Sequence, residues 1–553
     1  MGKIGRSPER YVSKALKKGR TEASVKHMTS EQKVQMKAAK LVEVRDWIAN
    51  EVLERLPPHL KPKPEDVLKT RWVLTWKKDE ATGSSRAKAR LVVLGYQDPR
   101  LGEEPVASPT MTRRARNMIF QLAAMKAWRL KKGDVKAAFL QGKGLPEDKP
   151  VFIAANEELA EELGLPMGVL MRLKKAVYGL CQAPKSWYES VDALMEQLGG
   201  QRCVSDPCVW VFSDKDGVFG IVGTHVDDFL ITGDNSKRWL EIETKLQKAF
   251  RWTPWEEGEF KQTGLWVNQD TSGRITIHQK EFIDNIKEIH ISSERRKQRT
   301  EKLTDSEMTS LRGALGEIQW VATQTLPRYQ AQCSIFQSSG PNATVETLFG
   351  INKLIRQIKL DPNYKLTFEP FEGKAVVVGW SDAAWANRPD GLSTGGYVIG
   401  IAPEGILDGK RTPVGWVSHR SGKLQRVARS SLAAEVQALT VAEDELFMVR
   451  MMWAELNGFV SDVVSGTASA GRELRPMIEG VREVQACLCV DAKSIYDCLA
   501  KQVQMQSLAE KRTALELMAF ERCIEETGLI VRWCHSEANL SDSLTKATAY
   551  GPI

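Results

Sequence analysis

The sequence predicts a multidomain protein that combines α/β and α+β architecture. Its 553 residues exceed what one hydrophobic core can organise. From about residue 70, apolar runs with strand spacing alternate with stretches of helical periodicity. Near Gly373 the pattern changes, and three strand-like runs precede one long helix. We therefore expect several domains, each with its own sheet and helices.

Composition excludes some classes of protein. The longest apolar runs are far shorter than the ~18 residues of a membrane span, and the N-terminus is charged where a secretory signal would be apolar. The nine cysteines are scattered without CxxC pairs, and Cys487 and Cys489 alternate with apolar residues on an expected strand. We expect buried free thiols and an intracellular, soluble product. The net charge of +8 is small for this length and by itself says little about nucleic acid.

The N-terminal part begins with a basic tract over residues 1–40, which we interpret as a disordered or helical solvated tail rather than a binding arm. Residues 41–56 are amphipathic at helical spacing, and "PPHLKPKPED" follows as a linker. We then expect a hairpin around "DEATGSS", a helix over 114–127, a strand into Asp134 and a helix over 187–198.

The stretch "IVGTHVDDFLITGD" places Asp227 and Asp228 inside an apolar, β-branched run. A regular strand would bury one of the two carboxylates, so we expect a tight turn between strands over 218–224 and 229–232. A solvated hairpin tip is the ordinary interpretation of such a pair. A site for a hard metal ion requires a further oxygen ligand from elsewhere.

Asp134, at the end of its expected strand in "KKGDVKAAFLQG", is a candidate for that ligand, although an isolated Asp in this position is usually a helix cap. Three carboxylates around two divalent ions suit an in-line phosphoryl displacement.

The C-terminal region repeats this arrangement. Asp382 ends the strand of "AVVVGWSDAAW", and Glu435 lies on the apolar stripe of a long helix that Ser431 can cap. Asp491 ends a fourth strand, and the segment after a fifth strand supplies His535 and Asp542. The Gly- and Ser-containing segment 461–480 is expected to be a loop. Taken singly, these acids would more often be caps or solvated residues.

In order along the chain, "RAKARLVVLGY", "DVKAAFLQG", "LKKAVYGLCQAPKSWY" and "HVDDFLITGD" resemble the reverse transcriptases of copia-type LTR retrotransposons. "SDAAW", "STGGYVIG", "SSLAAEVQAL" and "SDSLTK" resemble the ribonuclease H domain of the same family, with elements ordered β-β-β-α-β-α-β-α. The resemblance covers about residue 70 to the end. It implies a right-hand polymerase of fingers, palm and thumb, followed by a connection and an RNase H-like domain.

The resemblance also implies roles for individual residues. Two Mg²⁺ ions, with Mn²⁺ as an alternative, would bind at each of two sites. The ligands would be Asp134, Asp227 and Asp228 in the polymerase, and Asp382, Glu435, Asp491 and Asp542 in the nuclease. His535 would assist product release or proton transfer.

Residues around the polymerase site would bind the nucleotide and the template. Phe139 would close off the nucleotide 2′-hydroxyl, or else be an ordinary core phenylalanine, and Gln182 would lie beside the incoming base. Gly264 in "EFKQTGLWV" would allow the close backbone approach of a primer grip. A contact to the triphosphate would come from Lys78, Lys88 or Arg90, and the sequence leaves open which of them makes it.

We expect an N-terminal segment over 1–65, fingers and palm over 66–235, a thumb over 236–300, a connection over 301–372 and an RNase H-like domain over 373–553. The expected partners are an RNA template, a DNA primer, the RNA·DNA hybrid and dNTPs, with no membrane. A homodimer, or association with other Pol and Gag products, stays open, as does a location in cytoplasmic particles or the nucleus.

Two sequence features depart from the family pattern. His225 stands where the family usually has Tyr or Phe, and Leu326, Pro327 and Arg328 stand where it has Arg-Pro-Asp. These departures leave two alternatives to an RNA- and DNA-templated polymerase with RNase H. One is a decayed or co-opted element that only binds nucleic acid, and the other is a nuclease with an inert palm.

Overall fold

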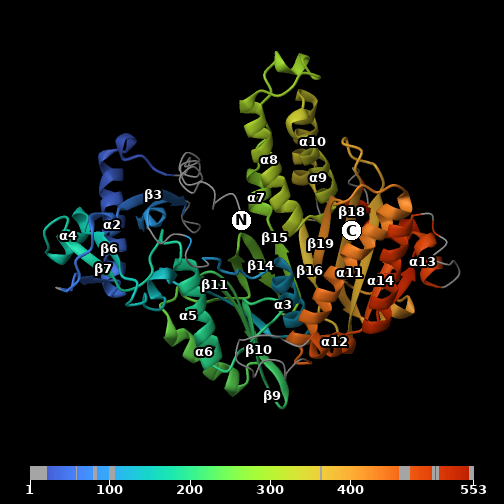
Figure 1. The fold of residues 1–553 in the computed structure, drawn as a ribbon, viewed down its shortest axis with the longest axis horizontal. Helices are drawn as coiled ribbons and strands as arrows, with labels where there is room; N and C mark the ends of the chain where they lie inside the picture. Colours follow the sequence, from blue (N-terminus) through green and yellow to red (C-terminus); the bar gives the residue numbers. More distant parts are fainter. Residues whose placement is uncertain are drawn as a thin grey trace. The chain divides into compact units, whose positions relative to one another are not determined.

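The computed structural model describes residues 22–57, 59–78, 84–98, 102, 106–361, 364–459, 474–500, 505, 508 and 510–546. Contacts divide the chain into two compact units, each made of segments far apart in sequence. Unit 1 comprises Met1–Thr110, Asp134–Gly199 and Thr244–Thr253, and unit 2 comprises Met111–Gly133, Gly200–Glu243 and Pro254–Ile553. Figure 1 follows these segments along the chain by colour. No helix in the described ranges combines the length and apolar character that crossing a bilayer requires.

Unit 1 contains a four-stranded sheet of order β1-β7-β6-β2 and a separate hairpin of β3 and β4. Its strands are β1 (Leu53–Arg55), β2 (Val67–Leu68), β3 (Thr70–Lys78), β4 (Ser85–Val93), β6 (Val151–Ala154) and β7 (Leu170–Leu173). Its helices are α2 (Ser30–Ala49), α4 (Glu157–Leu163) and α5 (Ala183–Gln197). The expected hairpin forms, although residues 79–83 of its "DEATGSS" turn lie outside the described residues.

Helix α2 corrects the helix expected over residues 41–56. It begins earlier because Thr29 and Gln32 form a capping box, and it ends at Ala49 with Asn50 as its C-cap. Residues 53–55 instead form strand β1, paired with β7. The helix is tied to the hairpin, since the Glu43 carboxylate accepts a hydrogen bond of 3.3 Å from the backbone amide of Leu91.

Unit 2 begins with a six-stranded sheet of order β12-β5-β11-β10-β9-β8. These strands are β5 (Arg129–Asp134, whose last residue is grouped with unit 1), β8 (Gln201–Arg202), β9 (Val209–Asp214), β10 (Gly217–His225), β11 (Asp228–Gly233) and β12 (Glu256–Glu257). The helices that accompany it are α3 (Arg113–Met125) and α6 (Lys237–Ala249), whose residues from Thr244 are grouped with unit 1. The strands and helices expected from the sequence are present here with shifts of a few residues.

A four-stranded sheet of order β13-β14-β15-β16 and a group of helices follow. The strands are β13 (Glu259–Gln262), β14 (Leu265–Gln269), β15 (Ile275–His278) and β16 (Lys365–Phe368). The helices are α7 (Lys280–Asn285), α8 (Asp305–Gln324), α9 (Gln330–Ser338) and α10 (Val345–Leu360), and α8, α9 and α10 pack together (Figure 1). Their shared core includes Ile318, Val321, Leu348, Ile351 and Ile355, which are fully buried.

The last sheet of unit 2 has five strands in the order β19-β18-β17-β20-β21. They are β17 (Ala375–Ala384), β18 (Thr394–Pro403), β19 (Gly415–Lys423), β20 (Ala486–Val490) and β21 (Ile530–Trp533). β17 pairs antiparallel with β18 and parallel with β20, and β20 pairs parallel with β21. The long helix α11 (Ser431–Leu456) packs against β17 and β18. Figure 1 labels α11 and β18 in this domain. Further helices are α12 (Leu474–Glu483), α13 (Lys493–Leu499) and α14 (Lys511–Thr527).

Three expectations for this region were wrong in detail. Part of the expected loop 461–480 is helical, since α12 begins at Leu474, while residues 460–473 lie outside the described ranges. Ser430 rather than Ser431 caps α11, its hydroxyl accepting a hydrogen bond of 3.1 Å from the amide of Ala433. Two short 3-10 turns, Ser536–Ala538 and Asp542–Leu544, rather than a final α-helix, follow β21 within the described residues.

Candidate active site

The Asp227–Asp228 pair lies at the tip of a tight hairpin, as the sequence predicted. β10 and β11 pair from Gly220 opposite Gly233 to His225 opposite Asp228, so Val226 and Asp227 form a two-residue turn. Val226 has a φ of +64°, a backbone region that is strained for a β-branched side chain. Both aspartates are half-buried.

A glycine pair and a tryptophan hold this hairpin from its other end. Gly220 and Gly233 lie opposite each other in the β10–β11 register. The indole of Trp239, on α6, covers both, and a Cβ atom added at Gly220 or Gly233 would lie 2.1 or 2.4 Å from the ring. Only glycine therefore allows Trp239 to pack this closely, and the buried indole fixes the position of the strands that carry the aspartates.

The turn between β13 and β14 contacts the catalytic candidate Asp228. The backbone amide of Thr263 donates a hydrogen bond of 3.0 Å to Oδ2 of Asp228. Thr263 and Gly264 have φ values of +46° and +82°, the conformation of a two-residue type I′ turn. Glycine at 264 thus serves the turn geometry that presents the amide of Thr263 to the carboxylate.

Asp134 ends strand β5, which neighbours β11 in the six-stranded sheet. The residue itself is grouped with unit 1, whereas Asp227 and Asp228 belong to unit 2. Its convergence with the other two aspartates stays a prediction.

Some of the candidate nucleotide-binding side chains of unit 1 lie close together. The rings of Phe139 and Tyr178 are 5.2 Å apart, and the guanidinium of Arg90 lies 5.2 Å from the centre of the Tyr178 ring. Phe139 also packs against the apolar core, so its two interpretations remain open. Gln182 directly precedes α5 as its N-cap residue.

Lys88 lies in a charged environment within the same unit. Burial lowers the pKa of its ammonium, as does the charge of Arg90, whereas Glu43 and Asp134 raise it. The pKa of Lys88 is lowered overall. The side chain of Lys78 lies outside the described residues, and the choice among the three triphosphate candidates stays a prediction.

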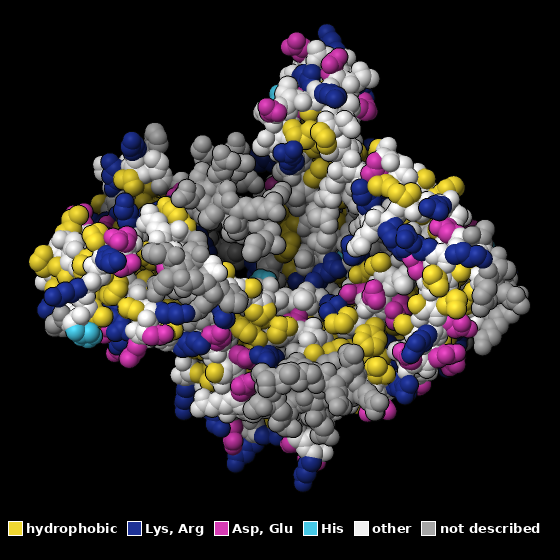
Figure 2. Space-filling view, viewed as in Figure 1, with side chains coloured by type: hydrophobic (Ala, Val, Ile, Leu, Met, Phe, Trp, Pro, Cys, Tyr) yellow, Lys and Arg dark blue, Asp and Glu magenta, His cyan; other side chains and the backbone are white. Residues whose placement is uncertain are grey.

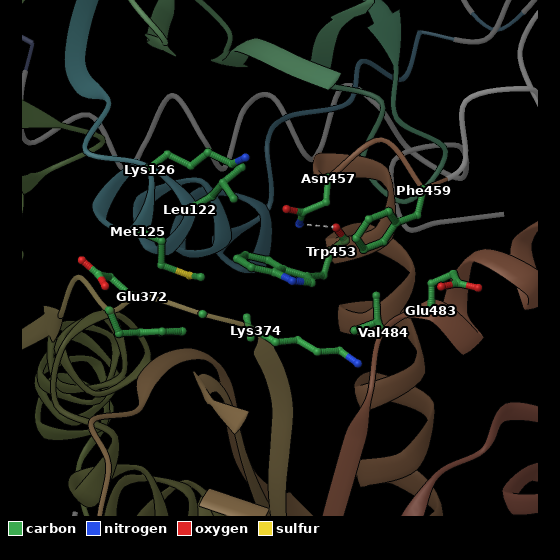
Figure 3. Close-up of a pocket in the computed structure, with 13 residues that line it drawn as sticks. Leu122, Met125, Lys126, Glu372, Lys374, Trp453, Asn457, Phe459, Glu483 and Val484 are labelled. Carbon is green, nitrogen blue, oxygen red and sulfur yellow. Dashed lines mark hydrogen bonds between the residues drawn. The ribbon is translucent and has the colours of Figure 1, made fainter. Parts of the chain in front are cut away.

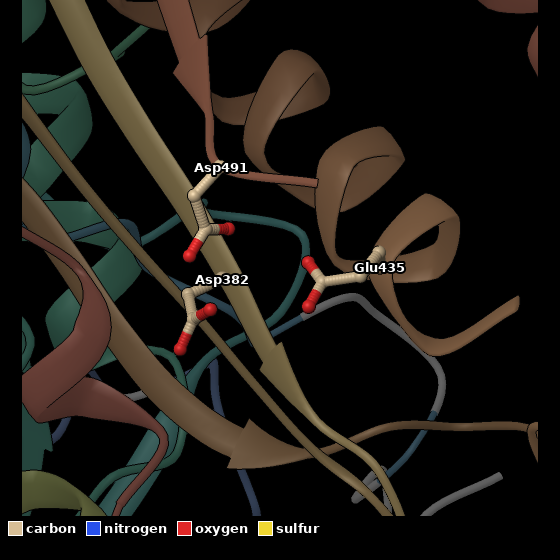
Figure 4. Close-up of side chains that lie close together, drawn as sticks. All are labelled: Asp382, Glu435 and Asp491. Atoms are coloured by element: carbon tan, nitrogen blue, oxygen red, sulfur yellow. The ribbon is translucent and has the colours of Figure 1, made fainter. Parts of the chain in front are cut away.

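The C-terminal acids form a cluster. Ligand oxygens of Asp382, Glu435 and Asp491 all lie within 4.8 Å of one another. Their carboxylates point toward one another from the end of β17, the first turns of α11 and the residue after β20 (Figure 4). The fold therefore brings these three residues together, as expected from the sequence.

The electrostatics of the cluster favour a bound cation. Burial, followed by the charges of Asp382 and Asp491, raises the pKa of Glu435 to about 9. Burial is also the main cause that raises the pKa of Asp382 to about 6. Carboxylates held together against their own repulsion suit a hard divalent ion such as Mg²⁺ or Mn²⁺, which prefers oxygen ligands.

The two other nuclease candidates lie outside this group of three. Asp542, on the 3-10 turn after β21, is ion-paired with Lys546 but still raises the pKa of Asp382 by its charge. The His535 side chain is 68% exposed, and its Nδ1 accepts a hydrogen bond of 3.3 Å from the amide of Glu537. Their proposed roles stay predictions.

The structure adds supporting residues that sequence reasoning missed. The hydroxyl of Thr545 donates to Oδ2 of Asp382, and the buried amide of Asn539 donates a hydrogen bond of 3.0 Å to the carbonyl of Ser381. Both contacts fix the end of β17. "SDSLTK" contained Thr545 and Lys546, but only Asp542 in it was assigned a role.

Two further features are the charged surface and a cavity in unit 2. Basic and acidic side chains are interspersed on the face in Figure 2. A cavity of 430 Å³ in unit 2 is lined by the ends of α3 and α11 and by the segment before β17 (Figure 3). Its lining includes Leu122, Trp453 and Phe459, and none of the clustered carboxylates.

Comparisons with known proteins agree with the sequence resemblance. Residues 59–297 match the family described as "Reverse transcriptase (RNA-dependent DNA polymerase)". The "Retrovirus-related Pol polyprotein from transposon RE1" of Arabidopsis thaliana is 26% identical over 435 residues, which are 75% of this chain and 28% of that protein. The corresponding polyprotein from transposon TNT 1-94 of Nicotiana tabacum is 29% identical over 228 residues, 41% of this chain and 17% of that protein.

Among solved structures, a foamy viral protease-reverse transcriptase in complex with double-stranded DNA matches with a TM-score of 0.46 and 13% identity, over 92% of this chain and 79% of that chain. Residues 59–297 are thus similar in sequence to reverse transcriptases. Over a longer range the chain is similar to the Pol polyproteins of retrotransposons, and it spans less than a third of the length of the two named above.

Proposed function

We propose that this chain is an RNA- and DNA-directed DNA polymerase with RNase H activity, which copies retrotransposon RNA into DNA and degrades the RNA of the resulting hybrid. The observation that carries the polymerase is the family match over residues 59–297, with Asp227 and Asp228 at a hairpin tip inside it. The observation that supports the nuclease is the cluster of Asp382, Glu435 and Asp491.

In the proposed polymerase, Asp134, Asp227 and Asp228 would hold two divalent ions. The ions would supply Lewis-acid stabilisation of the charge that develops on the attacking and leaving oxygens. The amide of Thr263 orients the Asp228 carboxylate. Phe139, Gln182 and the basic residues of the β3–β4 hairpin would bind the dNTP and the template strand.

In the proposed nuclease, Asp382, Glu435 and Asp491 would hold the ions, with Asp542 as a further ligand. Thr545 and Asn539 fix the end of β17 and with it the position of Asp382. Because an RNA·DNA hybrid is bound mainly through its backbone and 2′-hydroxyl groups, we expect little base specificity and a strong dependence on salt.

Two substitutions test the assignment in the full-length chain. Asp228→Asn should lower magnesium-dependent extension of oligo(dT) on poly(rA) by at least about a hundredfold and leave hybrid cleavage intact. Glu435→Gln should lower hybrid cleavage and leave primer extension intact. Asp216→Asn is a matched control, because Asp216 is 68% exposed and lies at the opposite end of β10. If both activities survive Asp228→Asn combined with Asp382→Asn, the residue assignment is wrong.

The same assay separates the alternative functions. A wild-type chain that binds hybrid but neither extends a primer nor cleaves RNA would be a decayed or co-opted binding protein. The departures that motivate this alternative are His225 and the altered segment Leu326, Pro327 and Arg328. Cleavage without extension would identify a nuclease with an inert palm.

A further inference from the structure

The fourth acid of the nuclease region, Asp542, forms an ion pair with a lysine of the same chain. Lys546 lies four residues after Asp542, and its ammonium forms an ion pair with the Asp542 carboxylate. Exposed ion pairs of this kind usually contribute little to stability, and the Lys546 side chain is 55% exposed. A structural role alone therefore gives little reason for this contact.

The ammonium also acts on the three clustered carboxylates. Lys546 directly follows Thr545, whose hydroxyl donates to Oδ2 of Asp382. The hydrogen bond to Asp542 is the largest cause that raises the pKa of Lys546, and the charges of Asp382 and Asp491 raise it further. In return, the positive charge of Lys546 favours the ionised forms of Asp382 and Glu435. Lys546 is thus a cation at the border of an anionic cluster whose oxygens lie within 4.8 Å of one another.

We propose that Lys546 is a positioning residue that competes with a divalent ion at the nuclease cluster, by holding Asp542 in an ion pair and by placing a positive charge beside the other carboxylates. This inference rests on the proposed nuclease function. To bind an ion, Asp542 has to exchange the ammonium for the metal, and the ion has to approach against a like charge. The long, largely exposed lysine chain can turn into solvent when this exchange occurs.

The proposed competition predicts that a substitution at this site increases the affinity for divalent ions. Removing the charge at position 546 should tighten divalent-ion binding, whereas loss of a merely structural contact would weaken it or leave it unchanged. The test measures free Mn²⁺ by electron paramagnetic resonance in the full chain that carries Asp227→Asn and Asp228→Asn. These two substitutions remove the hairpin carboxylates as a source of binding.

In this background, Lys546→Met should lower the dissociation constant for Mn²⁺ by about threefold or more, since one unit charge near the site is removed. Lys546→Arg keeps the charge and should bind Mn²⁺ as the parent does. The gain from Lys546→Met should shrink when Asp542→Asn is also present, because the lysine then has no carboxylate to hold. Thermal melting followed by circular dichroism checks that each variant is folded.

If Lys546→Met binds Mn²⁺ as weakly as the parent or more weakly, the proposed competition is wrong. The metal site itself would still be supported if Glu435→Gln abolishes Mn²⁺ binding by the parent. If the parent shows no binding that depends on Glu435, the proposed metal site fails, and the role of Lys546 fails with it.

Discussion

The backbone amide of Thr263 donates a hydrogen bond to the carboxylate of Asp228, although the two residues lie on different sheets of unit 2. An amide donor favours the ionised form of a carboxylate and fixes its direction. The β13–β14 turn is thereby connected to the hairpin that carries the proposed polymerase aspartates. Its geometry should matter for primer extension even though Thr263 contributes no side-chain atom to the contact.

Gly264→Ala tests this connection. Gly264 has a φ of +82°, and an alanine there costs about 1–2 kcal/mol of backbone strain. Relief of that strain would move the adjacent amide of Thr263 away from Asp228. We expect primer extension to fall several-fold while hybrid cleavage stays unchanged, as measured with the two assays on one preparation.

Gly273→Ala provides the matched control for this change. Gly273 lies in the β14–β15 turn of the same sheet, with a similar φ of +87°. Its substitution should cause comparable strain without affecting extension. Equal losses of extension in the two variants would show that general destabilisation, rather than the contact to Asp228, explains the effect.

Glu443 should make the stability of the chain depend on pH. Its side chain is 8% exposed on α11, and burial, with a smaller effect of Asp444, raises its pKa to about 7 against the partial compensation of Arg450. Cys523 also faces this carboxyl, since the charge of Glu443 raises the pKa of its thiol. Because the folded-state pKa is raised, the folded form retains the proton more strongly than the unfolded chain.

The resulting stability is therefore fully present below the unfolded pKa of 4.5 and is lost as the pH rises through about 7. Glu443→Gln should raise the thermal midpoint at pH 8, by the equivalent of at most about 3 kcal/mol, and have little effect near pH 4.5. Melting curves of both proteins across this pH range give the measurement. A gain of equal size at every pH would contradict the explanation by ionisation.

Much of the candidate site was predictable because its signals are local. Two charges inside a β-branched run indicate a turn, and the hairpin of β10 and β11 places Asp227 and Asp228 at its tip. Acids at strand ends indicate convergence where strands lie side by side, which explains why Asp382 and Asp491 meet.

The remaining features depend on non-local packing or on weaker local signals. A backbone amide such as that of Thr263 leaves no trace in the residue pattern, so its contact with Asp228 could not be predicted. The start of α2 was predictable, because Thr29 and Gln32 have the spacing of a capping box. The whole segment 461–480 was expected to be a loop because of its glycines and serines, although apolar residues spaced by three and four occur near its end, where α12 begins.

Glu455 connects the loop before β9 to helix α11. Its carboxylate accepts hydrogen bonds from the backbone amides of Val204, at 2.5 Å, and Ser205, at 3.1 Å. Glu455→Ala leaves both amides without this acceptor, at a cost of about 1–3 kcal/mol for each group that stays buried. The thermal midpoint should fall, and Glu455→Gln, which keeps one acceptor oxygen, should fall less. Glu525→Ala, an exposed position on α14, should leave the midpoint unchanged.

The packing of Trp239 on the glycine pair predicts a compensating double substitution. A Cβ atom at Gly233 would lie 2.4 Å from the indole, so Gly233→Ala should be destabilising while Trp239 is present. Trp239→Leu alone should also be destabilising, because it leaves a cavity where a buried ring was.

When the two changes are combined, the added methyl group fills part of the space that the smaller side chain vacates. The double variant should therefore be more stable than the sum of the single effects predicts, by about 0.5–3 kcal/mol. Thermal midpoints of the four proteins complete the cycle, and primer extension should recover in parallel, because the same contact fixes the strands that carry Asp227 and Asp228. Strictly additive effects would mean that the indole does not require glycine at position 233.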